Sequence, residues 1–144
     1  EINLGAAALL PTDYVADVHQ RLVLYKRIAS APDVAALEEL QVELVDRFGP
    51  LPDQAGTLLA QARLRLQARR LGAIAISGGE NGFSISLIEQ PNIDVDALLK
   101  LIRSEPKIYR FDGRSKLSAN LPTATVPQRL QAVADLVDRL LPGG

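Results

Sequence analysis

The sequence contains no cysteine, methionine or tryptophan, and aromatic residues make up only 4% of its 144 positions. Without cysteine, the chain cannot form disulfides, thiolate nucleophiles, iron–sulfur clusters or zinc sites that use sulfur ligands. Its single histidine, His19, lacks the usual partners for a metal site or a histidine-based catalytic triad. This composition fits a reducing cytoplasm, which is the compartment we expect.

A strong charge of either sign is also missing, because 16 Lys and Arg oppose 17 Asp and Glu to leave a net charge of −1. We therefore expect no direct binding of nucleic acid. No apolar run approaches the roughly 18 residues of a membrane span, and no basic segment of a secretory signal opens the chain. Since the chain starts at Glu1 and ends at Pro142-Gly143-Gly144, we expect it to be a piece of a longer polypeptide.

The residues that are present predict a helical first half. Hydrophobic residues make up 47% of the chain, which is enough for the core of one domain of this length. The first 12 residues lack a helical stripe and predict an extended arm or lead-in strand. Capping residues, apolar spacings of three and four, and Gly-Pro breaks then predict three helices, over residues 13–30, 33–48 and 53–71.

After Gly72 the apolar period shortens to two, which is typical of strands. The pattern predicts a β-hairpin over residues 74–87 and two short strands near 108–111 and 116–117. Asp94 and Thr125 suit the N-caps of a short helix and of a final helix. The predicted fold class is α+β: N-terminal helices followed by a small, mostly antiparallel sheet with flanking helices, in a single domain.

The glycine-rich segment 78–82 is a candidate for a phosphate-binding loop, because backbone amides in such turns can face an anion. A P-loop, however, has Gly-Lys-Ser/Thr leading into a helix, whereas strand patterns flank this segment on both sides. We therefore interpret it as a hairpin turn. The sequence singles out no catalytic residue and no residue that would bind a cofactor or metal ion.

The second predicted helix carries Glu39, Glu43 and Asp46 at spacings of four and three residues. These acids share a face opposite the apolar stripe of the helix, and we call them the acidic ridge. We expect the three like charges to be unpaired along the helix. A solvated surface and a docking surface for a partner's arginines both explain such a ridge, and the spacing by itself leaves the two open.

Several stretches, taken together and in order, resemble one family. They read Leu-Pro-Thr-Asp-Tyr-Val at 10–15, Arg-Leu-Val-Leu-Tyr-Lys-Arg-Ile-Ala at 21–29 and Val-Glu-Leu-Val-Asp-Arg-Phe-Gly at 42–49, followed by Leu51-Pro52. The similarity continues through 62–65, 71–72 and 109–113. From about residue 10 to 141, the chain resembles the C-terminal domain of bacterial transcription-repair coupling factors.

The resemblance implies a non-catalytic regulatory module at the end of a large ATP-dependent DNA translocase. Such a parent protein displaces stalled RNA polymerase from DNA and recruits nucleotide excision repair. Its ATP and magnesium ions belong to motor domains, and no Walker A sequence occurs in this chain. We expect no cofactor here.

In the family, this domain folds back on an N-terminal module of the same chain, covers the surface that binds the damage-recognition ATPase UvrA, and restrains the motor. Carried over residue by residue, the masking contact falls on Glu43 and Asp46, facing arginines of the N-terminal module. Glu39 extends the same ridge.

The resemblance also implies boundaries: an arm or linker from the preceding translocase module at 1–12, the regulatory domain at 13–141, and a tail at 142–144. One alternative is a stand-alone interaction module that recruits a partner in trans through the ridge or the arm. Another is an enzyme or small-molecule binder, which would need a concave pocket with convergent polar groups.

Overall fold

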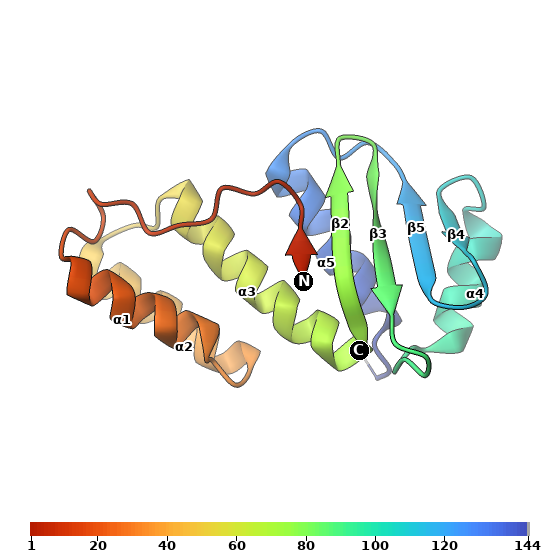
Figure 1. Cartoon of the computed structure of the whole chain (residues 1–144), viewed down its shortest axis with the longest axis horizontal. Coiled ribbons are helices and arrows are strands. Elements are labelled where there is room, and N and C mark those ends of the chain that lie inside the picture. The colour runs from red at the N-terminus through yellow and green to blue at the C-terminus, as the bar shows by residue number, and fades with distance from the viewer. Residues whose placement is uncertain (144) are drawn as a thin grey trace. The chain divides into compact units, whose positions relative to one another are not determined.

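The computed structural model describes residues 1–143, and the chain groups into two compact units. The helical unit comprises Ala7–Leu66, and the sheet unit combines Glu1–Ala6 with the residues from Gln67 onward. One helix, α3 (Asp53–Leu71), contributes to both units because the boundary falls inside it (Figure 1). The domain boundaries expected from the sequence stay predictions; in this grouping, residues 1–6 and 7–12 fall in different units.

The helical unit consists of α1 (Val18–Ala29), α2 (Val34–Phe48) and most of α3 (Figure 1). Its core draws on all three helices and on the segment before α1. Tyr14 ties that segment to α2, because its hydroxyl donates to the carbonyl oxygens of Leu44 and Gly49 at 3.1 and 2.8 Å. The buried core residues are Leu10, Val15, Leu24, Ile28, Leu37, Leu40, Leu44, Ala55, Leu59 and Ala62.

The predicted start of the first helix at residue 13 is wrong. The helix begins at Val18, with Asp17 as its N-cap accepting the amide hydrogen of Gln20 at 2.9 Å. Residues 11–15 form a turn instead, in which the amides of Tyr14 and Val15 both donate to the carbonyl of Pro11. Val15 is fully buried in this turn, so tertiary packing outweighs the local capping preference of Thr12 or Asp13.

The second and third predicted helices are confirmed as α2 and α3, and each ends at the glycine that the sequence indicated. Asp33 caps α2 by accepting the amide hydrogen of Ala36 at 2.8 Å, and α2 ends at Gly49. Gly72 follows α3 with a φ of 96°, a left-handed conformation that favours glycine. A Cβ at Gly72 would also lie 2.9 Å from the side chain of Ile88.

The sheet unit contains five strands: β1 (Ile2–Asn3), β2 (Ala73–Gly79), β3 (Gly82–Leu87), β4 (Tyr109–Phe111) and β5 (Lys116–Asn120). Their order is β1-β2-β3-β5-β4, and every pairing is antiparallel except that of β1 with β2. The α+β class and the mostly antiparallel sheet are confirmed.

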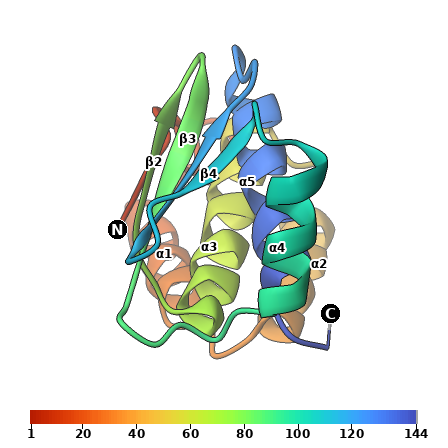
Figure 2. The same cartoon turned by 90° about the vertical axis from the view of Figure 1, so that its right-hand side faces the viewer.

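Both remaining helices, α4 (Val95–Ser104) and α5 (Val126–Leu140), lie on one side of this sheet (Figure 2). Buried side chains of the strands alternate toward them, among them Ile76, Phe83, Ile85 and Leu117. The two helices contribute the other buried side chains of this core, which include Leu98, Leu101, Leu130, Val133, Leu136, Val137 and Leu140. Leu4, only 1% exposed, shows that the predicted arm is in part a packed segment.

The glycine-rich turn between β2 and β3 is held by two buried side chains, Thr123 and Arg129. The Thr123 hydroxyl donates to the Gly79 carbonyl and accepts the Gly82 amide hydrogen. Arg129 Nε donates to the carbonyls of Gly79 and Thr123 at 2.9 and 3.1 Å, and its Nη1 donates to that of Leu4 at 2.6 Å. This arginine therefore joins α5, the hairpin turn and the segment after β1.

Candidate interaction surface on α2

The acidic ridge lies on α2, on the side away from the core of the helical unit. Leu37, Leu40 and Leu44 on the opposite side are 4%, 3% and 0% exposed. Glu39 and Asp46 are exposed, and Glu43 is half-buried at the border between the two sides. The sequence spacing therefore placed the three carboxylates on the correct side of the helix.

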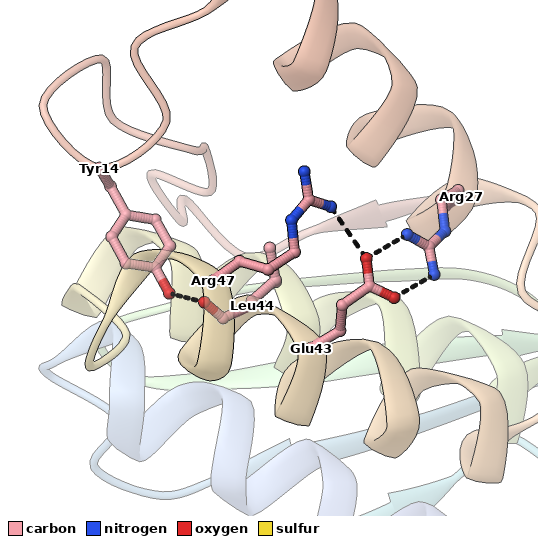
Figure 3. A network of polar contacts seen from close by, with 5 residues as sticks. All are labelled: Tyr14, Arg27, Glu43, Leu44 and Arg47. Atoms are coloured by element: carbon pink, nitrogen blue, oxygen red, sulfur yellow. Dashed lines mark hydrogen bonds and ion pairs between the residues drawn. The ribbon is translucent and has the colours of Figure 1, made fainter.

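Glu43 accepts hydrogen bonds from two arginines of the same unit (Figure 3). Arg27 from α1 binds it through both terminal nitrogens, with Nη1 2.6 Å from Oε2 and Nη2 2.8 Å from Oε1. Arg47, one turn further along α2, donates to Oε2 at 3.0 Å. Its guanidinium also lies 4.9 Å from the ring centre of Phe48, which favours this orientation.

The electrostatics of Glu43 follow from these contacts. Hydrogen bonds from Arg27, and then from Arg47, lower the pKa of Glu43 from 4.5 to about 2. The same bond to Glu43 raises the pKa of Arg27. Both partners keep their charges at neutral pH, so Glu43 is a neutralised carboxylate within the helical unit.

The expectation that all three ridge carboxylates are unpaired is therefore wrong for Glu43. The i, i+4 spacing of Glu43 and Arg47 was available in the sequence as a signal for this pair. The bidentate bond from Arg27 had no such signal, because it depends on the packing of α1 beside α2.

Glu39 and Asp46 differ from Glu43, because neither side chain takes part in an ion pair or a hydrogen bond within residues 1–143. Val42 lies three residues after Glu39 and four before Asp46, and is therefore on the same side of α2. Val42 is 61% exposed, and Val45 is 40% exposed beside it. We call these four residues, Glu39, Val42, Val45 and Asp46, the docking face.

The other residues considered in the sequence, His19 and the segment 78–82, lie outside the acidic ridge. Within residues 1–143, no group of three or more His, Asp or Glu side chains could hold a metal ion. His19 is exposed on α1, and the segment 78–82 is the turn of a hairpin. Its Gly79 carbonyl and Gly82 amide bond to Thr123 and Arg129, so this turn does not fit a nucleotide phosphate. No helix among the described residues is both long and apolar enough to cross a membrane.

Comparison with known proteins relates the chain to one group. The model of the TRCF domain family matches residues 4–98. Transcription-repair-coupling factors of Escherichia coli and Haemophilus influenzae are 43% and 42% identical to the chain over 96% and 95% of its length. The matched segments make up 11% and 12% of those proteins, so the chain spans about a tenth of the length of these curated relatives.

The fold agrees with this relationship. A crystal structure of the C-terminal domain of transcription-repair coupling factor superposes with a TM-score of 0.75 at 23% identity, covering 96% of this chain and 89% of the solved one. The fold is thus that of an α+β domain of this type, and the family match supports the expectation that the domain itself is non-catalytic. The chain belongs to the TRCF domain family.

Proposed function

We propose that this chain is a regulatory module of a transcription-repair coupling factor, and that its docking face binds an N-terminal module of the same parent protein. This contact covers the surface that recruits UvrA and restrains the ATP-dependent, magnesium-dependent translocase motor. The parent protein acts on DNA and on stalled RNA polymerase in the bacterial cytoplasm. The observation that carries the proposal is the pair of exposed, unpaired carboxylates, Glu39 and Asp46, on either side of exposed Val42.

The three ridge acids have different roles in this proposal. Asp46 and Glu39 supply charge that arginines of the N-terminal module neutralise. Glu43 contributes to the contact indirectly. Its oxygens already accept three hydrogen bonds from Arg27 and Arg47, and these bonds fix the positions of the two guanidinium groups. A partner arginine reaches Glu43 only by displacing one of these two.

The energy that such a switch needs is small. Keeping it about 99% closed takes roughly 2.7 kcal/mol, which a tether at an effective concentration near 1 mM supplies with an intrinsic Kd of about 10 μM. Exposed ion pairs contribute about 0.2–1 kcal/mol each. Full burial of a valine is worth roughly 1.5–3 kcal/mol, and Val42 and Val45 still have about half of that surface to bury. Two ion pairs and two valines together supply roughly 2–5 kcal/mol. This is less than the roughly 7 kcal/mol that corresponds to a Kd of about 10 μM, so other residues of the interface must contribute the rest.

Charge reversal in the full-length parent protein tests this proposal. We expect Glu39→Lys with Asp46→Lys to open the contact and to tighten UvrA binding by up to about 100-fold, the factor by which a 99% closed state weakens it. Glu89→Lys with Glu105→Lys is the matched control, because it makes the same charge change at exposed positions of the sheet unit. Equal UvrA affinity of the reversed, control and wild-type proteins would exclude the masking role.

A titration in trans separates masking from the alternative of a stand-alone recruiting module. The isolated chain should bind the isolated N-terminal module weakly, and the affinity should fall as salt rises from 50 to about 300 mM because exposed ion pairs are screened. The alternative predicts no binding to that module at either salt concentration.

A further inference from the structure

One face of the sheet in the sheet unit carries an uninterrupted row of small polar side chains. The strand registers align Ser77 of β2 with Ser84 of β3, and Ser84 with Ser118 of β5. Ser118 in turn faces Arg110 of the edge strand β4. Because α4 and α5 both lie on the other side of the sheet, neither of these two helices covers the row (Figure 2).

Beside this row the face is hollowed, with a volume of about 1030 Å³. Gly79 and Gly82 are paired across the hairpin, so the next row carries no side chain on β2 and β3. A Cβ at Gly82 would lie 2.0 Å from the Ala119 carbonyl, so that position excludes any larger residue. The hollow is therefore bounded by the three serines, by the hairpin turn, and by the segment that leads into β4.

Positive charge borders the hollow. Lys107 and Arg110 line it, and Lys116 lies two residues before Ser118 on the same face of β5. None of the three takes part in an ion pair among residues 1–143. Glu80, on the hairpin turn, is the acidic residue among those that line the hollow. Asp112, near Lys116, uses its Oδ1 to accept three backbone amide hydrogens of its own turn.

We propose that this serine-lined hollow binds an extended acidic segment of a protein, with Arg110 as its principal contact. Carboxylates of the segment pair with the guanidinium of Arg110 and with Lys107, and its backbone and side chains bond to the serine hydroxyls. An extended chain that lies parallel to the strands matches this face, because its alternate side chains recur at about 7 Å, similar to the spacing of same-face residues along one strand, such as Lys116 and Ser118.

The composition of the face favours a protein segment over nucleic acid. Proteins that bind single strands stack bases on exposed aromatic rings, whereas the aromatic residue that lines this hollow, Phe83, is 6% exposed and points to the core. Three cations also neutralise few phosphates, which would give little affinity for a polyanion at physiological salt. The proposal is independent of the docking face, which lies on the helical unit.

The test uses the 144-residue chain and a fluorescent ten-residue peptide that alternates glutamate and serine. We expect saturable binding in the range of tens to hundreds of micromolar at low salt, with amide NMR shifts centred on Ser77, Ser84 and Ser118. Arg110→Glu should weaken binding about fivefold or more. Arg114→Glu is the control: it makes the same charge change in the turn at the far end of β4 and β5 and should change the affinity less than twofold.

Each other outcome overturns the proposal. Absence of binding at 1 mM peptide would show that the hollow is an ordinary solvated face. An equal loss in the two variants would show that only net charge matters. Tighter binding of a ten-nucleotide oligothymidylate than of the peptide would assign the face to single-stranded nucleic acid.

Discussion

Among individual residues, Glu43 couples the stability of the helical unit to pH. Its pKa of about 2 in the folded chain lies below the ordinary 4.5, so its contribution is complete above about pH 4.5 and is lost as the pH falls toward 2. We expect Glu43→Gln to lower the free energy of unfolding by about 0.5–1 kcal/mol at pH 7, a small value because solvent screens this pair. Urea denaturation at pH 7, 4 and 2.5 measures the difference.

The matched control is Glu39→Gln, because Glu39 has no partner within the described residues. Its difference from the wild type should stay close to zero at all three pH values. If the cost of Glu43→Gln were the same at pH 2.5 as at pH 7, the ion pairs with Arg27 and Arg47 would not contribute to stability.

Arg129 is the residue whose role the sequence did not indicate. The residue is 7% exposed, and its guanidinium donates to four carbonyl groups from three segments of the sheet unit. We expect Arg129→Lys to destabilise the chain by roughly 2–4 kcal/mol, because a point ammonium cannot span these acceptors and leaves some of them unsatisfied.

Arg139→Lys, at an exposed position of the same helix, is the control for Arg129→Lys and should change stability by less than about 0.5 kcal/mol. Chemical denaturation of both variants gives the comparison. Equal small effects would mean that the buried arginine is replaceable and does not fix the hairpin turn.

Among the elements, the β2–β3 hairpin depends more on Gly82 than on Gly79. Gly82 has a φ of 128°, and a Cβ there would lie 2.0 Å from the Ala119 carbonyl. At Gly79 a Cβ would meet nothing within 4 Å. We expect Gly82→Ala to cost at least about 3 kcal/mol and Gly79→Ala less than about 0.5 kcal/mol, as thermal and urea unfolding would measure. Similar costs at both positions would contradict this account of the turn.

The elements also show which parts of the fold local sequence can predict. The limits of α2 and α3 follow from Asp33, Gly49 and Gly72, whose capping roles depend on neighbours within a few residues. The start of α1 was mispredicted, because Asp13 and Asp17 are both suitable caps and the hydroxyl contacts of Tyr14 decide between them. The parallel pairing of β1 with β2 joins residues more than seventy positions apart, which no local pattern encodes.

The same division applies to the candidate site. The position of Glu39, Glu43 and Asp46 on one side of α2 follows from helical periodicity, and so does the pairing of Glu43 with Arg47. The bond from Arg27 depends on how α1 packs beside α2. Sequence periodicity therefore located the surface, whereas only tertiary structure showed that Glu39 and Asp46 are the carboxylates left for a partner.

At the scale of the whole molecule, charge is distributed between local surfaces instead of forming one field. The net charge is −1, while the docking face is acidic and the serine-lined hollow is bordered by Lys107, Arg110 and Lys116. Each surface can therefore select a partner of opposite charge by short-range contacts, and the molecule as a whole attracts neither polycations nor polyanions over long distances.

This balance predicts that the chain does not bind duplex DNA directly. Non-specific binding typically has a Kd of 10⁻⁴–10⁻⁶ M at physiological salt and depends on several lysines or arginines that neutralise phosphates together. With three clustered cations at the hollow, we expect a Kd weaker than about 100 μM for a labelled 20-base-pair duplex in 150 mM salt, measured by fluorescence anisotropy.

The Glu39→Lys, Asp46→Lys variant, which adds four positive charges to a net charge of −1, provides a more basic control and should bind the duplex more tightly at low salt. Micromolar binding by the wild-type chain would instead require a cooperative basic surface, and the assignment of the hollow to acidic protein segments would then have to be abandoned.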